Sequence, residues 1–199
     1  MFIRSERLFL RPAWPEDAAE LHPLVDDEAL ARMVRVPWPY RLDDARAYAA
    51  MPQAPRYPHF VITLPQAPGG ARLVGTVGFA PFEGEVELGY WIARDCWDRG
   101  YATEAVRAAL SIARTLGHCR IIASHFADNH ASRRVLAKLG FVPAGERSGR
   151  PAAVAQGGLI RRSCCVCGGP ALDGRKWFCA NVSARRKAGS PRSKRPGCC

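Results

Sequence analysis

The chain has 199 residues, of which 48% are hydrophobic and 24% charged, and this composition suits one globular domain rather than a disordered or fibrous protein. No run of roughly 18 apolar residues occurs, so the sequence predicts no membrane-spanning helix and no membrane partner. The first 11 residues lack the apolar stretch of a secretory signal. The expected location is therefore cytoplasmic.

The net charge of +11 and the cysteines are concentrated in the last quarter of the chain. Residues 1–150 carry 19 basic and 17 acidic side chains, whereas residues 151–199 carry 10 basic side chains and one acidic, Asp173. Cys96 and Cys119 stand in the first part, and the other six cysteines in the second. The charge therefore does not indicate a basic surface for nucleic acid over the whole protein. We expect a nearly neutral domain over 1–150 and a basic, cysteine-rich tail over 151–199.

Strand and helix signals alternate through residues 1–150. Strands are indicated by β-rich runs between turn residues, and helices by apolar stripes with capping residues. In chain order, the predicted elements are a strand over 8–11, a helix opening at Pro15, a helix over 43–50, strands over 59–64, 72–79 and 85–92, a helix over 102–116, a strand over 120–125, a helix over 129–139 and a strand from Phe141. The three consecutive strands joined by tight turns predict an antiparallel meander in an α+β domain.

The periodic pattern stops after about residue 149. Only eight large apolar residues stand among the last 49, too few to offset the entropy of ordering that segment unaided. The tail is therefore expected to be disordered, held by a metal, or packed on the main domain.

The most informative stretch is 85–105, which predicts a strand, a short loop and a helix. The first N–H groups of a helix lack intrahelical partners and the helix dipole adds partial positive charge, so such a junction can hold an anion. Gly100 permits a close approach of the backbone, Ala102 is small, and Arg99 stands at the rim. A strand, turn and helix without a ligand would look the same, so this stretch alone leaves both interpretations open.

Several short stretches carry more information in their order than any one of them does alone. They are SERLFLRP from Ser5, EDA from Glu16, LVGTVGF from Leu73, ELGYW from Glu87, WDRGYATEA from Trp97, and N-x-x-S followed by LGF from Asn129. In this order, over about residues 3–148, they resemble the GNAT acetyltransferases, most closely the RimJ/RimL type that acetylates the N-termini of ribosomal proteins.

The resemblance implies a GNAT fold, with a mixed central sheet in which an antiparallel meander adjoins a splayed parallel pair, flanked by helices. It also implies acetyl-CoA as co-substrate, with no metal, and direct acetyl transfer to a primary amine of a protein N-terminus or a small molecule. The alternative from another class is a catalytically impaired CoA-binding module whose activity lies in a zinc- or nucleic-acid-binding tail.

The resemblance assigns the contacts to acetyl-CoA to a strand, a loop and a helix start. The strand backbone would pair with the pantetheine arm, the loop would hold the pyrophosphate, and the helix start would contact the pantetheine or its water. The implied residues are Tyr90, Trp91 and Ile92, then Trp97, Asp98, Arg99, Gly100, Tyr101, Ala102 and Thr103, and finally Asn129. Trp97 stands where the general family pattern has Gln or Arg.

Amine acetylation requires a proton acceptor for the amine and a proton donor for the thiolate. Glu87, on the strand that lines the cleft, is the candidate base, although a carboxylate merely paired with an arginine would fit equally, and Glu85 lies on the same face. Many family members use a tyrosine as the acid where this chain has Leu136, so Ser132 is the candidate acid here. The alternative interpretation of Ser132 is an ordinary serine in the first turn of a helix, without a catalytic role.

The tail departs from the family pattern, because no convincing β-run follows Phe141 to Arg147. We therefore expect the C-terminal strand to be missing or altered. Cys164, Cys167 and Cys179 have the spacing of three zinc ligands, but Ser183 stands where the fourth is expected. The sequence favours an unselected tail over a finger that contacts nucleic acid or the ribosome.

Overall fold

The computed structural model describes residues 1–82, 84–148 and 159–166. Its strands are β1 (Ile3–Arg4), β2 (Phe9–Arg11), β3 (His59–Gln66), β4 (Gly70–Phe82), β5 (Glu85–Ile92), β6 (Arg120–Phe126), β7 (Val142–Ser148) and β8 (Leu159–Val166). Its α-helices are α1 (Ala18–Val25), α2 (Glu28–Ala31), α3 (Leu42–Ala49), α4 (Tyr101–Thr115) and α5 (His130–Lys138), and 3-10 turns cover Pro15–Asp17 and Arg94–Cys96.

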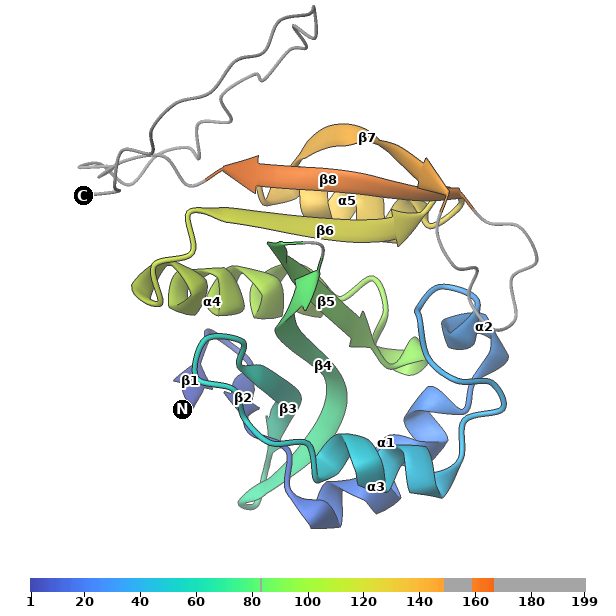
Figure 1. The fold of residues 1–199 in the computed structure, drawn as a ribbon. Helices are drawn as coiled ribbons and strands as arrows, with labels where there is room; N and C mark the ends of the chain where they lie inside the picture. The colour runs from blue at the N-terminus through green and yellow to red at the C-terminus, as the bar shows by residue number, and fades with distance from the viewer. Residues whose placement is uncertain (83, 149–158, 167–199) are drawn as a thin grey trace, which may run out of the picture.

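The strands form one mixed sheet, which confirms the α+β prediction. Within the described chain, the strand order is β1-β2-β3-β4-β5-β6-β8-β7 (Figure 1). The strands β5 and β6 are parallel, and all the other adjacent strands of the described sheet are antiparallel. The predicted meander is β3-β4-β5, and the parallel pair adjoins it as expected.

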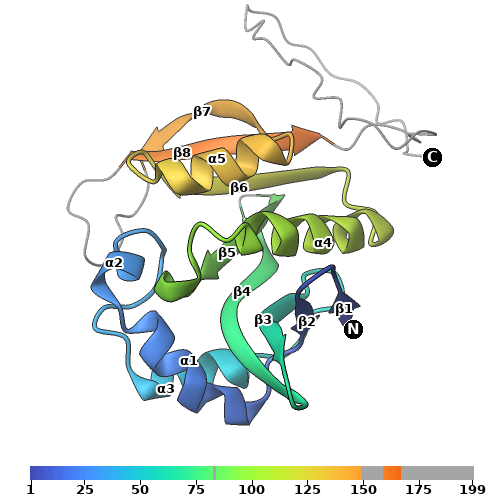
Figure 2. The same cartoon turned by 180° about the vertical axis from the view of Figure 1, so that it is seen from behind.

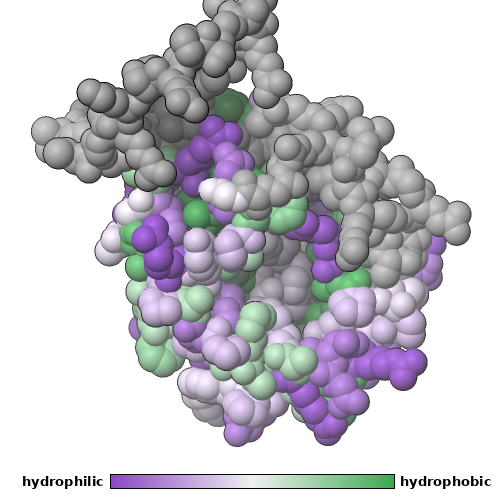
Figure 3. Space-filling model, viewed as in Figure 1, coloured by the Kyte–Doolittle hydropathy of each residue, from purple (hydrophilic) through white to green (hydrophobic). Residues whose placement is uncertain are grey.

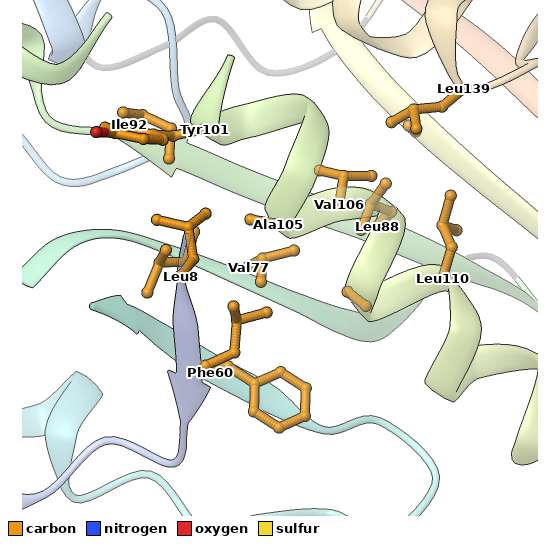
Figure 4. Packing of buried hydrophobic residues seen from close by; sticks show 14 of the residues in the cluster. Leu8, Phe60, Val77, Leu88, Ile92, Tyr101, Ala105, Val106, Leu110 and Leu139 are labelled. Atoms are coloured by element: carbon orange, nitrogen blue, oxygen red, sulfur yellow. The ribbon is translucent and has the colours of Figure 1, made fainter. Parts of the chain in front are cut away.

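The two faces of the sheet are covered by different helices, and each face has its own core. Helix α4 packs on one face, where Phe60, Leu88 and Val106 belong to the larger buried cluster (Figure 4). Helices α1 and α3 pack on the other face, where Val61 and Leu73 belong to the second cluster. Figure 2 shows α4 and α5 from their own side. Because strand side chains alternate between faces, neighbouring residues of β3 enter opposite cores.

The C-terminal strand, which the sequence predicts to be missing or altered, is present as β8. Strand β8 lies in the segment expected to be tail and is inserted between β6 and β7, antiparallel to both. Its sequence, LIRRSCCV, gave a weak signal because only its ends carry large aliphatic residues. The edge of β6 facing away from β5 offers unpaired backbone groups, and pairing with β8 satisfies them. The remaining tail, including Cys167 and Cys179, lies outside the described residues.

The surface of the domain mixes polar and apolar residues. In Figure 3, hydrophilic side chains gather over the end of the molecule that carries α1 and α3. None of the helices in the described ranges is long and apolar enough to cross a membrane.

Candidate functional site

The site forms where the two parallel strands separate. Strand β5 pairs with β6 only over Val86–Leu88, opposite Ile121–Ala123. Beyond this point β6 continues to pair with β8, while residues 89–92 of β5 diverge from β6 within the described sheet. A cavity of about 1050 Å³ opens at the separation. An extended ligand can pair with the exposed edge of β5 there as an added strand.

The cavity reaches both faces of the sheet through this gap. Leu88 and Ile92 lie in the core under α4, whereas Trp91 packs against the core under α1 and α3. The alternation places Glu87 and Gly89 on the α1–α3 face with Trp91. The lining includes residues of α1, α3, α4 and α5. Two molecules can therefore meet in the gap, each approaching from its own face.

The loop before α4 presents backbone N–H groups to the cavity. Gly100 adopts φ +80°, and Asp98 is also left-handed, at φ 57°. The first helical hydrogen bond runs from the N–H of Glu104 to the carbonyl of Gly100 at 3.1 Å, so the N–H groups of residues 101–103 precede it. Such a helix start attracts anions, phosphates included.

An N-terminal segment braces this loop through a buried carboxylate. Glu104 accepts hydrogen bonds from the Ser5 hydroxyl (2.8 Å), the Arg7 N–H (2.7 Å) and the Arg7 Nε (2.8 Å). The Arg7 guanidinium also donates to the carbonyl of Arg99 at 3.1 Å and lies over the Tyr101 ring. Burial raises the pKa of Glu104, but the hydrogen bonds from Arg7 and Ser5 outweigh it, so that the pKa lies below its ordinary value.

Two hydroxyls meet on the α4–α5 face of the gap. The Tyr90 hydroxyl lies 2.8 Å from the Ser132 Oγ, and either group can donate. Burial raises the pKa of Tyr90 to about 12, so its phenol is protonated at neutral pH. The Asn129 side chain holds Ser132 in place, because its Oδ1 caps α5 by accepting from the Ser132 N–H at 2.9 Å. This pair can deliver a proton to an atom in the gap.

One carboxylate lies on the opposite face. Glu87 is buried, with a side chain only 7% exposed. Its Oε1 accepts a hydrogen bond from the Ser124 hydroxyl at 2.6 Å, and its Oε2 is ion-paired with Arg35 at 2.7 Å. Glu87 can accept a proton or bind a cation in the cavity.

The floor of the cavity on the α1–α3 face is open over Gly89. Gly89 pairs with Gly78, which in turn pairs with His59, so the three residues form one row across the sheet. A Cβ at position 89 would meet no atom within 4 Å. Burial lowers the pKa of His59, which therefore stays neutral near pH 7. Tyr48 lies against the His59 ring. The open floor ends at Gly78, where an added Cβ would meet the Cβ of His59 at 2.6 Å.

The structure brings almost all the predicted site residues together around the cavity. The residues that line it are Glu87, Tyr90, Trp91, Ile92, Trp97, Asp98, Gly100, Tyr101, Ala102, Thr103, Asn129 and Ser132. Arg99 is not among the lining residues, and its carbonyl is bound by Arg7. The Ile92 side chain is buried in the core under α4, so only its backbone groups can serve a ligand, whereas the half-buried Trp91 side chain itself lines the cavity. The indole N–H of Trp97 donates to the Ile92 carbonyl at 2.7 Å.

Glu85 and two other titratable residues near the site are held by structural contacts. Glu85 is ion-paired with Arg120 at 2.5 Å and is not among the residues that line the cavity. His125 is bound to the Phe126 carbonyl at 2.8 Å. Cys96 is buried in the larger core, and this burial raises the pKa of its thiol, which suits packing rather than nucleophilic chemistry.

Arg35 and Ser124 are the functional candidates that the sequence did not single out. Both contact Glu87, from 52 and 37 residues away along the chain. No local motif marks them.

Comparison with known proteins identifies the family. A model of the acetyltransferase (GNAT) domain matches residues 7–142. The chain belongs to the GNAT acetyltransferase family. It is an acetyl-CoA-dependent N-acetyltransferase, and the helix start and open strand edge described above fit a long anionic co-substrate.

Individual relatives agree with this assignment. The chain is 29% identical over 147 residues to the uncharacterized N-acetyltransferase YoaA of Bacillus subtilis (strain 168), a match covering 70% of this chain and 81% of that protein. A GNAT-family acetyltransferase from Bacillus anthracis has a TM-score of 0.70 at 24% identity, covering 83% of this chain and 98% of that one. An acetyltransferase from Salmonella typhimurium that modifies the N-terminal serine of a 50S ribosomal subunit protein has a TM-score of 0.67 at 17% identity, covering 83% and 99%. At these identities the two structures show the shared fold.

The bonds around Glu104 predict a stability effect that depends on pH. Because the pKa of Glu104 is lowered on folding, its carboxylate contributes to the free energy of unfolding. This contribution is complete at pH values above the unfolded-state pKa and is lost as the pH falls through the folded-state pKa. Glu104→Gln should cost about 1–3 kcal/mol of unfolding free energy at pH 7, since it removes a charged acceptor from buried donors. Urea unfolding at several pH values measures this cost, which should shrink below about pH 4. Exposed Glu6→Gln is the control, and an equal loss in both variants would contradict the prediction.

Proposed function

We propose that this chain transfers the acetyl group of acetyl-CoA to the primary amine of a peptide N-terminus or a small molecule, in the cytoplasm. The observation that carries the proposal is one continuous cavity that extends from the start of α4, through the β5–β6 gap, to the buried Glu87. The Salmonella protein with this fold modifies an N-terminal serine, which supports an amine acceptor of the same kind here.

In this proposal, the loop and the strand edge hold the co-substrate. The N–H groups of residues 98–103 bind its pyrophosphate, helped by the α4 dipole. The backbone of residues 89–92 pairs with its pantetheine arm, and Asn129 lies beside that arm. An N–H group of residues 90–92 donates to the carbonyl oxygen as negative charge develops on it. When bound, acetyl-CoA supplies an acetyl group activated as a thioester.

Proton transfer is divided between the two faces of β5. Glu87 takes a proton from the amine on the α1–α3 face, while Ser132, hydrogen-bonded to Tyr90, gives a proton to the departing sulfur on the α4–α5 face. The bond from the carbonyl carbon to nitrogen forms as its bond to sulfur breaks.

The activity is tested by CoA release from acetyl-CoA with a panel of primary amines and short peptides. The wild type should release CoA in proportion to acetylated product. Gly100→Glu should lower acetyl-CoA affinity at least about tenfold, because a carboxylate would stand at the anion site and a side chain at φ +80° is strained.

Gly117→Glu is the matched control for this variant. Gly117 ends α4 at φ +79°, so the backbone strain is similar but lies at the other end of the helix. Calorimetric titration with CoA should show weakened binding for Gly100→Glu alone. Equal weakening in both variants would show a stability effect rather than a role in binding.

The role of Glu87 as the base is tested by pH–rate profiles. Glu87→Gln should lower kcat/KM about 10²–10⁴-fold and remove the acidic limb of the profile, because the amide cannot accept the proton. Glu85→Gln, on the same strand and face, should leave both unchanged, since Glu85 is paired with Arg120 away from the cavity. An unchanged rate and acidic limb in Glu87→Gln would exclude Glu87 as the base.

The paired hydroxyls predict non-additive losses of activity. Ser132→Ala should lower kcat about 10²-fold or more with little change in the KM for acetyl-CoA, and Tyr90→Phe should lower it less. Because the two hydroxyls act as one pair, the double variant should lose no more than Ser132→Ala alone. Ser111→Ala, on exposed α4 surface, is the control. Fully additive losses would show that the hydroxyls act independently.

A further inference from the structure

The ion pair between Glu87 and Arg35 occupies the place that an acceptor amine must reach. Arg35 Nη2 lies 2.7 Å from Glu87 Oε2, and both residues line the cavity. The Glu87 side chain is 7% exposed and the Arg35 side chain 43% exposed. The carboxylate is therefore fixed on the strand, while the guanidinium extends from a loop over it and has room to move.

Arg35 is held near the gap by the protein itself. Its loop follows α2, and the Asn129 Nδ2 donates to the carbonyl of Met33 at 3.3 Å. The Arg35 guanidinium also lies 5.8 Å from the centre of the Phe82 ring. Contacts from the N-cap residue of α5 and from β4 thus hold the loop and its positive charge beside the gap.

The charges set a condition on the acceptor. An ammonium that approaches Glu87 adds a second positive charge beside one carboxylate, and Arg35 is then left without its partner in a partly buried site. An acceptor that also carries a carboxylate replaces both halves of the pair, because its ammonium meets Glu87 and its carboxylate meets Arg35. The four charges then alternate in sign.

We propose that Arg35 selects acceptors that carry an anionic group close to the reacting amine. This inference rests on the proposed function and narrows its substrate class. The chemistry is a primary amine with a carboxylate a few bonds away, supplied by a free amino acid or by a peptide whose first residues are acidic. Displacing Arg35 also frees the Oε2 of Glu87, the oxygen that would take the proton.

The test compares matched acceptors that differ in one charge. Glycine is set against glycinamide, and the amidated peptide Ser-Asp-Ala-Ala against Ser-Asn-Ala-Ala, with kcat/KM measured for wild type, Arg35→Gln and Arg35→Glu. The wild type should prefer the anionic member of at least one pair about tenfold or more, and the pair that shows it identifies the source of the carboxylate. Arg35→Gln should reduce the preference to about twofold or less, and Arg35→Glu should reverse it.

Arg32→Gln is the matched control, because Arg32 is exposed, pairs with Glu28, and does not line the cavity. CoA affinity by calorimetry should be unchanged in every variant, which shows that each is folded. A wild type without charge preference, or a preference that survives in Arg35→Gln, would overturn the inference while leaving the acetyltransferase function intact. Absence of transfer to every amine by the wild type would overturn the proposed function and the inference with it.

Discussion

The short parallel contact between β5 and β6 is the constraint on which the site depends. Three residue pairs hold the strands together, and the strands then diverge. Divergence leaves backbone groups of β5 without a strand partner on that side, a cost that a folded protein sustains only where a ligand or water can satisfy them. The strands can separate because each is anchored on its other side, β5 by β4 along eight residue pairs and β6 by β8 along seven.

The divergence also determines how the chemistry is divided. A strand presents successive side chains to opposite faces, so one strand at the gap can carry a base on one face and contribute a hydroxyl on the other. Glu87 and Tyr90 occupy such positions, three residues apart on β5. Gly89, between them, keeps the floor open on the base side. Local sequence thus provides the two chemical roles, and sheet topology provides the space between them.

Strong local signals made most of the fold predictable, and long-range contacts account for the rest. Strand β5 was predicted at its observed bounds and α4 within one residue, because the apolar pattern, turn residues and Gly117 cap all agree. Strand β8 was missed because its pairing with β6 stabilises a segment of weak intrinsic preference. Arg35 and Ser124 were missed for a similar reason, since only the folded sheet and loop bring them to Glu87.

The sequence left two interpretations of Glu87 open: a catalytic base, or a carboxylate paired with an arginine. These two interpretations are compatible. In the structure Glu87 has the arginine partner, and it also lies in the cavity on the face where an amine can enter. A buried carboxylate without a partner is costly, so the free protein benefits from a cation at this position. Because Arg35 comes from a partly exposed loop rather than from the sheet, an incoming ammonium can take over its role without disturbing the core. Arg35, which stabilises the Glu87 carboxylate before an acceptor binds, thereby becomes available to recognise the rest of the acceptor.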